Sequence, residues 1–181
     1  MMATETDFVF SIHDLRRQPG EMMELRRNFP TPERIGIDII AIEEATELNI
    51  SGRVESVSTG VLFTCEVTST AQGECVRCLD PISLPIRAQI QELFYYTIPV
   101  DLDEDEDEPL LIVDERIDVL PPIRDAVILD LPLQPHCSQD CLGLCPDCGE
   151  KIALNPDGHN HQQSDPRWAK LRDLGGPGAL T

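Results

Sequence analysis

Basic and aromatic residues are scarce in this chain. Lys and Arg number 14 against 33 Asp and Glu, which gives a formal net charge of −19, and aromatic residues make up 4% of the sequence. With so few aromatic side chains, the hydrophobic core must consist mainly of Ile, Val and Leu. No window approaches the roughly 20 consecutive apolar residues of a membrane-spanning helix. We therefore expect no membrane partner.

A secretory start is also missing. The first ten residues, MMATETDFVF, carry acids where a signal peptide would have basic residues, and no long apolar run follows them. We therefore expect a cytoplasmic location. In that reducing environment the seven cysteines are better interpreted as thiols or metal ligands than as disulfides.

The negative charge is unevenly distributed. Residues 101–108 hold seven acids, which cannot pack and so predict a solvated acidic loop. Residues 1–35, by contrast, hold six acids and five arginines, close to balance. The overall charge therefore does not exclude a nucleic-acid partner, because binding follows local patches.

Apolar residues alternate with polar ones through much of residues 36–96. The alternation predicts strands around 48–54, 61–67 and 84–90, with a hairpin turn at SVSTG (56–60). We also favour a strand, rather than a helix, at EMMELRRNF (21–29), and one helical turn at TPERIG (31–36). Ile112–Val113 predicts a short strand. A helical stripe follows: Ile117, Leu120, Ile123, Val127, Ile128 and Leu131.

The predicted fold class is α+β. It is an antiparallel β meander or partly closed barrel with a packing helix and a C-terminal zinc-binding appendage. We expect an α+β core domain at residues 1–135, with the acidic loop at 101–108. The appendage with a terminal helix is expected at 136–174, and a disordered tail at 175–181.

Four cysteines and two histidines lie within residues 137–161. CPDCG (145–149) has the spacing of a metal-binding turn, because two thiolates two residues apart can hold one ion and the glycine lets the backbone turn. We therefore predict a structural Zn²⁺ held by the four-cysteine set Cys137, Cys141, Cys145 and Cys148. The alternative keeps Cys145 and Cys148 and recruits His159 and His161. Unmetallated surface thiols are a further alternative.

A second Cys-x-x-Cys pair, Cys75 and Cys78, lies in GECVRCLDP (73–81). Its neighbours predict strands, whereas a redox pair usually opens a helix whose dipole lowers the thiol pKa. Three interpretations stay open. The pair closes a β-turn, forms a metal half-site with ligands from elsewhere, or acts in a thiol oxidoreductase.

Arginine makes up twelve of the fourteen basic residues, which suits phosphate contacts. The candidate nucleic-acid contacts are Arg16, Arg17, Arg26, Arg27, Arg167, Lys170 and Arg172, the last three beside Trp168. The alternative for all of them is a solvated face. The sequence has no P-loop, Gly-rich dinucleotide turn or Ser-His-Asp order, and we expect a protein that is not an enzyme.

Four stretches together resemble the bacterial YceD family. They are GECVRCLDPI, ERIDVLPPIRDAVILDLPLQPHC, DCLGLCPDCG and DPRWAKLRDL, in this order over residues from about 60 to 175. RRQPGEMMELRR, at residues 16–27, looks like the actinobacterial branch. Many relatives carry Cys-x-Cys where this chain has His159-Asn160-His161, so both positions keep metal-capable side chains.

The resemblance implies a cytoplasmic, non-enzymatic factor for accumulation of large-subunit ribosomal RNA, with a link to a zinc-containing ribosomal protein of the large subunit. The function hypothesis is an accessory factor in ribosome assembly that binds ribosomal RNA or a precursor large subunit. Two alternatives remain. One is a thiol oxidoreductase that uses Cys75 and Cys78, and the other is an acidic adaptor for a basic ribosomal protein.

Overall fold

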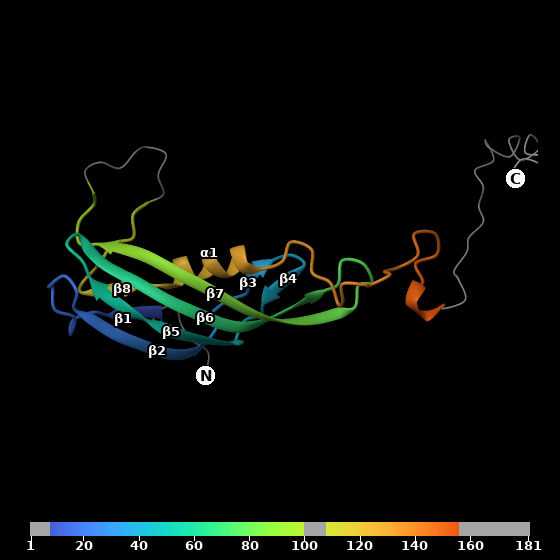
Figure 1. Cartoon of the computed structure of the whole chain (residues 1–181), viewed down its shortest axis with the longest axis horizontal. Coiled ribbons are helices and arrows are strands. Elements are labelled where there is room, and N and C mark those ends of the chain that lie inside the picture. The colour runs from blue at the N-terminus through green and yellow to red at the C-terminus, as the bar shows by residue number, and fades with distance from the viewer. Residues whose placement is uncertain (1–7, 100–107, 156–181) are drawn as a thin grey trace, which may run out of the picture.

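The computed structural model describes residues 8–99 and 108–155. A long hairpin of two 15-residue strands, β6 (Gly60–Glu74) and β7 (Pro81–Tyr95), forms the axis of the molecule (Figure 1). Fifteen antiparallel residue pairs join the two strands without a bulge. The other strands attach to the opposite edge of β6, so β7 lies at an edge of the sheet.

The remaining elements complete one six-stranded sheet and one two-stranded sheet. The larger sheet adds β2 (Met22–Pro30), β3 (Ile35–Ile37), β4 (Ile40–Ile42) and β5 (Glu47–Ser56). In the smaller sheet, β1 (Val9–Ser11) pairs with β8 (Arg116–Asp118). A helix, α1 (Leu120–Asp130), and a short 3-10 turn, η2 (Ile152–Leu154), follow. The fold is therefore mostly antiparallel sheet with one α-helix within the described residues, consistent with α+β. The sheet does not close into a barrel.

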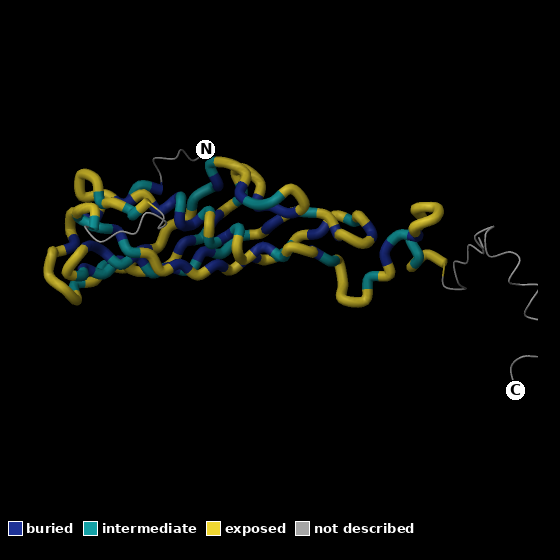
Figure 2. Tube along the Cα trace, turned by 90° about the horizontal axis from the view of Figure 1, so that it is seen from above, coloured by how far each residue is buried: buried dark blue, intermediate teal, exposed yellow. Residues whose placement is uncertain are grey.

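The two faces of the large sheet differ. Leu25, Val54, Phe63 and Ile90 point to one face and are buried beneath α1 and the β1–β8 pair. Their neighbours on the other face, including Arg26, Arg53 and Gln91, are exposed. Figure 2 shows the buried residues along the inside of this layered body and the exposed ones outside. The period-two alternation in the sequence produces this difference, since successive side chains on a strand point to opposite faces.

The strand interpretation of 21–29 is confirmed by β2, and the turn at 56–60 by the hydrogen bond that the Val57 N–H donates to Gly60 O (3.0 Å). Helix α1 contains Leu120, Ile123, Val127 and Ile128 of the predicted stripe, whereas Ile117 lies in β8 and Leu131 follows the last helical residue. Proline stands in its first turn, where the backbone N–H has no helical partner. Its buried side chains are Leu120, Pro122, Ile123 and Val127, and it packs against β7 and β3.

The helical turn predicted at 31–36 is wrong. Thr31 is 1% exposed and does not cap a helix; its hydroxyl donates to Glu43 O (2.7 Å) and accepts from the Thr46 N–H (3.0 Å). These bonds tie the chain to the β4–β5 connection, and residue 35 then begins β3. Tertiary hydrogen bonds therefore override the local capping pattern at this position.

The expected regions beyond the described residues are the acidic loop 101–108, apart from Glu108, the terminal helix before residue 174 and the tail 175–181. Within the described residues, 136–155 lie beyond the tip of the β6–β7 hairpin (Figure 1). No helix of the described part has the length and apolar character needed to cross a bilayer.

Candidate metal centre

The turn that joins β6 to β7 holds Cys75 and Cys78. Its backbone closes with two hydrogen bonds, from the Leu79 N–H to Cys75 O (2.9 Å) and from the Cys75 N–H to Asp80 O (2.8 Å). Leu79 has φ +58°, a left-handed conformation that non-glycine residues rarely adopt. The pair therefore lies in a tight turn between strands and not at the start of a helix.

The chain after α1 returns to this turn and docks on it. The Val76 N–H donates to Pro135 O (2.9 Å), and the Leu144 N–H donates to Arg77 O (2.9 Å). The Arg77 guanidinium donates through Nη1 to Cys141 O (3.0 Å). These bonds hold residues 135–144 against the hairpin tip and bring Cys137 and Cys141 to Cys75 and Cys78.

The four sulfur atoms lie within 4.8 Å of one another. Cys75 Sγ is 3.8 Å from Cys141 Sγ, and Cys78 Sγ is 3.6 Å from Cys137 Sγ. A tetrahedral zinc site with Zn–S bonds of about 2.3 Å has S–S edges of about 3.8 Å. The group, here called the four-thiol group, therefore has the donor set and the spacing of a metal site. It is the only such group within residues 8–99 and 108–155.

The thiol pKa values of the four-thiol group are shifted in different directions. Burial opposes ionisation of the Cys75 thiol, but backbone N–H groups of Cys137, Arg77 and Cys78 lower its pKa to about 6. The Asp80 backbone N–H favours the Cys78 thiolate, but burial and the thiols of Cys75 and Cys137 outweigh it and raise the pKa. The neighbouring Cys141 raises the pKa of Cys137, and burial raises that of Cys141. Anions crowded in this way are stabilised by a bound cation.

The predicted ligands Cys145 and Cys148 lie in a second turn of the same type. The Gly149 N–H donates to Cys145 O (2.9 Å), and the Cys145 N–H donates to Glu150 O (2.8 Å), the same pattern as in the first turn. Gly149 takes the left-handed position, φ +76°, that Leu79 holds in the first turn. An ion pair between Lys151 and Asp80 joins the two turns and lowers the pKa of the Asp80 carboxyl.

The predicted metal set and the observed group share only Cys137 and Cys141. The structure places Cys75 and Cys78, and not Cys145 and Cys148, beside Cys137 and Cys141, because residues 135–144 fold back onto the hairpin tip. His159 and His161 lie outside the described residues. The half-site interpretation of Cys75 and Cys78 agrees with this arrangement, in which the two further thiols come from about 60 residues downstream. A local motif cannot indicate which distant pair they are.

The structure describes four of the candidate phosphate contacts, Arg16, Arg17, Arg26 and Arg27. Arg16 and Arg17 lie between β1 and β2; Arg17 lies 4.9 Å from the ring centre of Tyr96 and 3.7 Å from a Glu115 carboxylate oxygen. Arg26 and Arg27 are successive residues of β2 and so point to opposite faces. Arg167, Lys170 and Arg172 are outside the described residues.

Comparison with known proteins identifies the family. A family model described as "Large ribosomal RNA subunit accumulation protein YceD" matches residues 63–175. The chain belongs to the YceD family. The match begins in β6 and includes both cysteine turns and the helix α1, so the four-thiol group lies within the family region.

Relatives at several levels of identity support this assignment. The uncharacterized protein Rv2926c of Mycobacterium tuberculosis is 48% identical over 164 residues, 90% of this chain and 79% of the relative. The uncharacterized protein ML1660 of Mycobacterium leprae is 39% identical over 93% of this chain and 78% of its own. The uncharacterized protein YlbN of Bacillus subtilis is 24% identical over 91% of this chain and 95% of its own length. The mycobacterial matches agree with the actinobacterial-like branch. No solved structure matches this chain.

Proposed function

We propose that this protein is a non-enzymatic accessory factor for the accumulation of large-subunit ribosomal RNA, and that it acts by binding a precursor of the large subunit. The description of the YceD family supports a role in the accumulation of large-subunit ribosomal RNA. The structural observation that supports a binding role is the four-thiol group, which joins the tip of the sheet to the C-terminal part of the family region. A closed four-thiolate site would hold distant segments of the chain together and would offer a substrate no open coordination position, which favours a binding role over catalysis.

We infer that the four-thiol group holds a structural Zn²⁺ through Cys75, Cys78, Cys137 and Cys141. Four thiolates fill a tetrahedral site, whereas a catalytic zinc keeps one position for water or substrate. The spacing of 3.6 and 3.8 Å between paired sulfurs suits such a closed site. When bound, the ion fixes residues 135–144 on the hairpin tip.

The oxidoreductase alternative fits the geometry less well. The Cys75 side chain is 0% exposed, and Cys78 is 7% exposed, so a protein disulfide has no access to the more acidic thiol. Thiol–disulfide exchange needs a thiolate that the substrate sulfur can approach. The two cysteines are therefore better suited to a metal than to redox turnover.

Sedimentation tests the proposed function. A tagged chain expressed in cells should sediment with precursor large subunits in a sucrose gradient, and crosslinks should map to large-subunit RNA or its bound proteins. Cells that lack the protein should accumulate less large-subunit RNA while small-subunit RNA is unchanged. A chain that stays at the top of the gradient, together with unchanged RNA levels, would remove the basis for the proposal.

Direct RNA contact by the N-terminal arginines gives a separate expectation. Changing Arg16 and Arg17, or Arg26 and Arg27, to Ala should weaken binding to RNA of any sequence. Each lost phosphate contact should flatten the slope of log K against log salt by about 0.7–0.9. Arg34→Ala is the matched control, because Arg34 is held by Glu43 and by the Ile37 and Asp38 carbonyls. An unchanged slope in both pairs would assign these residues to a solvated face.

A further inference from the structure

The outer edge of β7 carries backbone groups that point away from β6. The Arg87 N–H donates to the Asp130 carboxylate (3.2 Å), and the Tyr95 N–H donates to Leu110 O (2.8 Å). Neither acceptor belongs to β6. Because the register between the two strands is unbroken, every odd-numbered residue of β7 directs its N–H and C=O to this edge.

Half of the eight outward positions on that edge are protected against another strand. Pro81 and Pro85 occupy two of its first three outward positions and have no N–H to donate. Asp130 occupies the N–H of Arg87, and residues 110–112 pair with Tyr95. Between these two protected positions lie Gln89, Gln91 and Leu93. Their backbone N–H groups have no hydrogen-bond partner in the described part of the chain.

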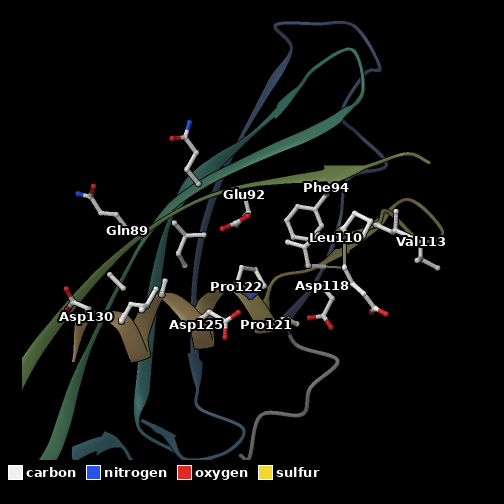
Figure 3. Close-up of a pocket in the computed structure, with 18 residues that line it drawn as sticks. Gln89, Glu92, Phe94, Leu110, Val113, Asp118, Pro121, Pro122, Asp125 and Asp130 are labelled. Carbon is white, nitrogen blue, oxygen red and sulfur yellow. The ribbon is translucent and has the colours of Figure 1, made fainter. Parts of the chain in front are cut away.

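The unprotected stretch opens into a groove of about 1040 Å³ between β7, α1 and residues 108–113 (Figure 3). Apolar side chains line it, among them Ile90, Phe94, Leu110, Pro122 and Ala126. Its charged residues are all acidic: Glu92, Glu108, Asp118, Asp125 and Asp130. Figure 3 shows Glu92 on the strand and Asp125 on the helix, on the two sides of the groove.

We infer that this groove binds an extended Lys- and Arg-rich protein segment, which adds to β7 as a further strand. The outward N–H and C=O groups of Gln89, Gln91 and Leu93 supply the main-chain hydrogen bonds, as in other cases of strand addition. The apolar lining receives alternate side chains of the segment, and the acids pair with its basic ones. At about 3.3 Å per residue, the space between Arg87 and Tyr95 accommodates about five to seven residues.

The charge of the groove selects among possible occupants. Five carboxylates, with no Lys or Arg among the described residues that line the groove, repel phosphates, so RNA is disfavoured. A second copy of this chain would bring the same acids face to face. A basic extended segment can pair both with the acidic side chains and with the strand edge of β7. The inference rests on the proposed function, since such a segment would belong to a precursor large subunit.

Fluorescence anisotropy with a defined probe tests the inference. The probe is a fluorescein-labelled heptapeptide amide, Lys-Val-Arg-Val-Lys-Val-Arg, and its matched control is the same peptide N-methylated at alternate residues. The full chain should bind the probe at low salt, and N-methylation should weaken binding about tenfold or more, since the methylated peptide cannot complete the strand hydrogen bonds. Equal binding of both peptides, or no binding of either, overturns the inference.

Substitutions in the protein provide an independent comparison. Gln91→Pro removes the central unpaired N–H and should weaken probe binding about tenfold. Ser83→Pro makes the same change at another outward position of β7, far from the groove, and should leave binding within about twofold. Asp125→Asn should weaken binding several-fold at low salt and less at high salt. Thermal unfolding of each variant verifies that the fold is intact.

Other results would identify a different occupant. Protection of Gln91 by a single-stranded RNA dodecamer would assign the groove to RNA, and a change from dimer to monomer in Gln91→Pro would assign it to a second copy. Either result overturns the inference. Sedimentation separates this outcome from failure of the proposed function. If wild type and Gln91→Pro both sediment with precursor large subunits, only the inference fails, whereas the proposed function fails if neither does.

Discussion

Purified Cys75→Ser should contain almost no zinc, whereas wild type contains about one ion per chain. The same loss is expected for Cys137→Ser, because each variant removes one of four thiolates that lie within 4.8 Å of one another. The three remaining sulfurs leave an open coordination position and a weaker site. Metal analysis after dialysis against a mild chelator gives the comparison directly.

Cys145→Ser separates the observed group from the ligand set predicted by local spacing. If the four-thiol group binds the ion, Cys145→Ser and Cys148→Ser should retain about one zinc per chain. If the ion instead uses Cys137, Cys141, Cys145 and Cys148, these two variants should lose it and Cys75→Ser should keep it. Cys65→Ala controls for loss of a cysteine as such, since Cys65 is buried in the sheet and burial raises its thiol pKa to about 12.

X-ray absorption adds a readout of the first coordination shell. The four-thiol group predicts sulfur alone, near 2.3 Å, in wild type. A nitrogen contribution near 2.0 Å that disappears in His159→Ala would instead support the mixed cysteine and histidine set. Loss of the metal should also increase proteolysis between residues 135 and 144, because this segment is then held on the hairpin tip only by hydrogen bonds such as that from Val76 N–H to Pro135 O.

The sequence predicts the sheet well because its signal is local. Residues 61–67 and 84–90 alternate, and the structure buries one face of each strand along β6 and β7. The stripe from Ile117 to Leu131 predicts α1 for the same reason, although its first residue belongs to β8, since helical periodicity and proline in the first turn both act over a few residues. Such patterns do not depend on the rest of the fold.

Features that depend on distant pairing could not be predicted. The turn at 75–80 and the segment 135–144 are about 60 residues apart, and only the hairpin β6–β7 and the return of the chain after α1 bring them together. Loop-closure entropy favours neighbouring cysteines as ligands, which explains the choice of Cys145 and Cys148 from spacing alone. In the folded chain, hydrogen bonds of Arg77 to residues 139–144 bring the distant pair Cys75 and Cys78 beside Cys137 and Cys141.

The free edge of β7 is a second feature of this kind. Proline is typical of edge strands, but the outward orientation of Pro81 and Pro85 follows only from the register with β6. Likewise, the acids Glu92, Asp118 and Asp125 belong to three different elements, and no linear pattern unites them. The groove therefore becomes apparent only when the strand, the helix and residues 108–113 are seen together.

Phe63→Ala should destabilise the fold by about 3–5 kcal/mol, the range for removal of a buried phenylalanine side chain. Phe63 lies in the middle of the β5–β6–β7 region and is 0% exposed. Its ring meets that of Phe94 at 6.3 Å and 75°, an edge-to-face contact. In a core built mainly from aliphatic side chains, the other side chains cannot fill the volume that the lost ring leaves.

The loss is large compared with the 5–15 kcal/mol that stabilises a typical domain. The thermal midpoint should fall by on the order of 10 °C, and urea unfolding should give a lower midpoint with an unchanged slope. Leu62→Ala is the matched control. Leu62 precedes Phe63 on the same strand but points to the opposite face and is only partly buried, so its loss should destabilise the fold less than the loss of Phe63. Equal destabilisation by the two substitutions would contradict the assignment of the buried face, and with it the position of Phe94 in the wall of the groove.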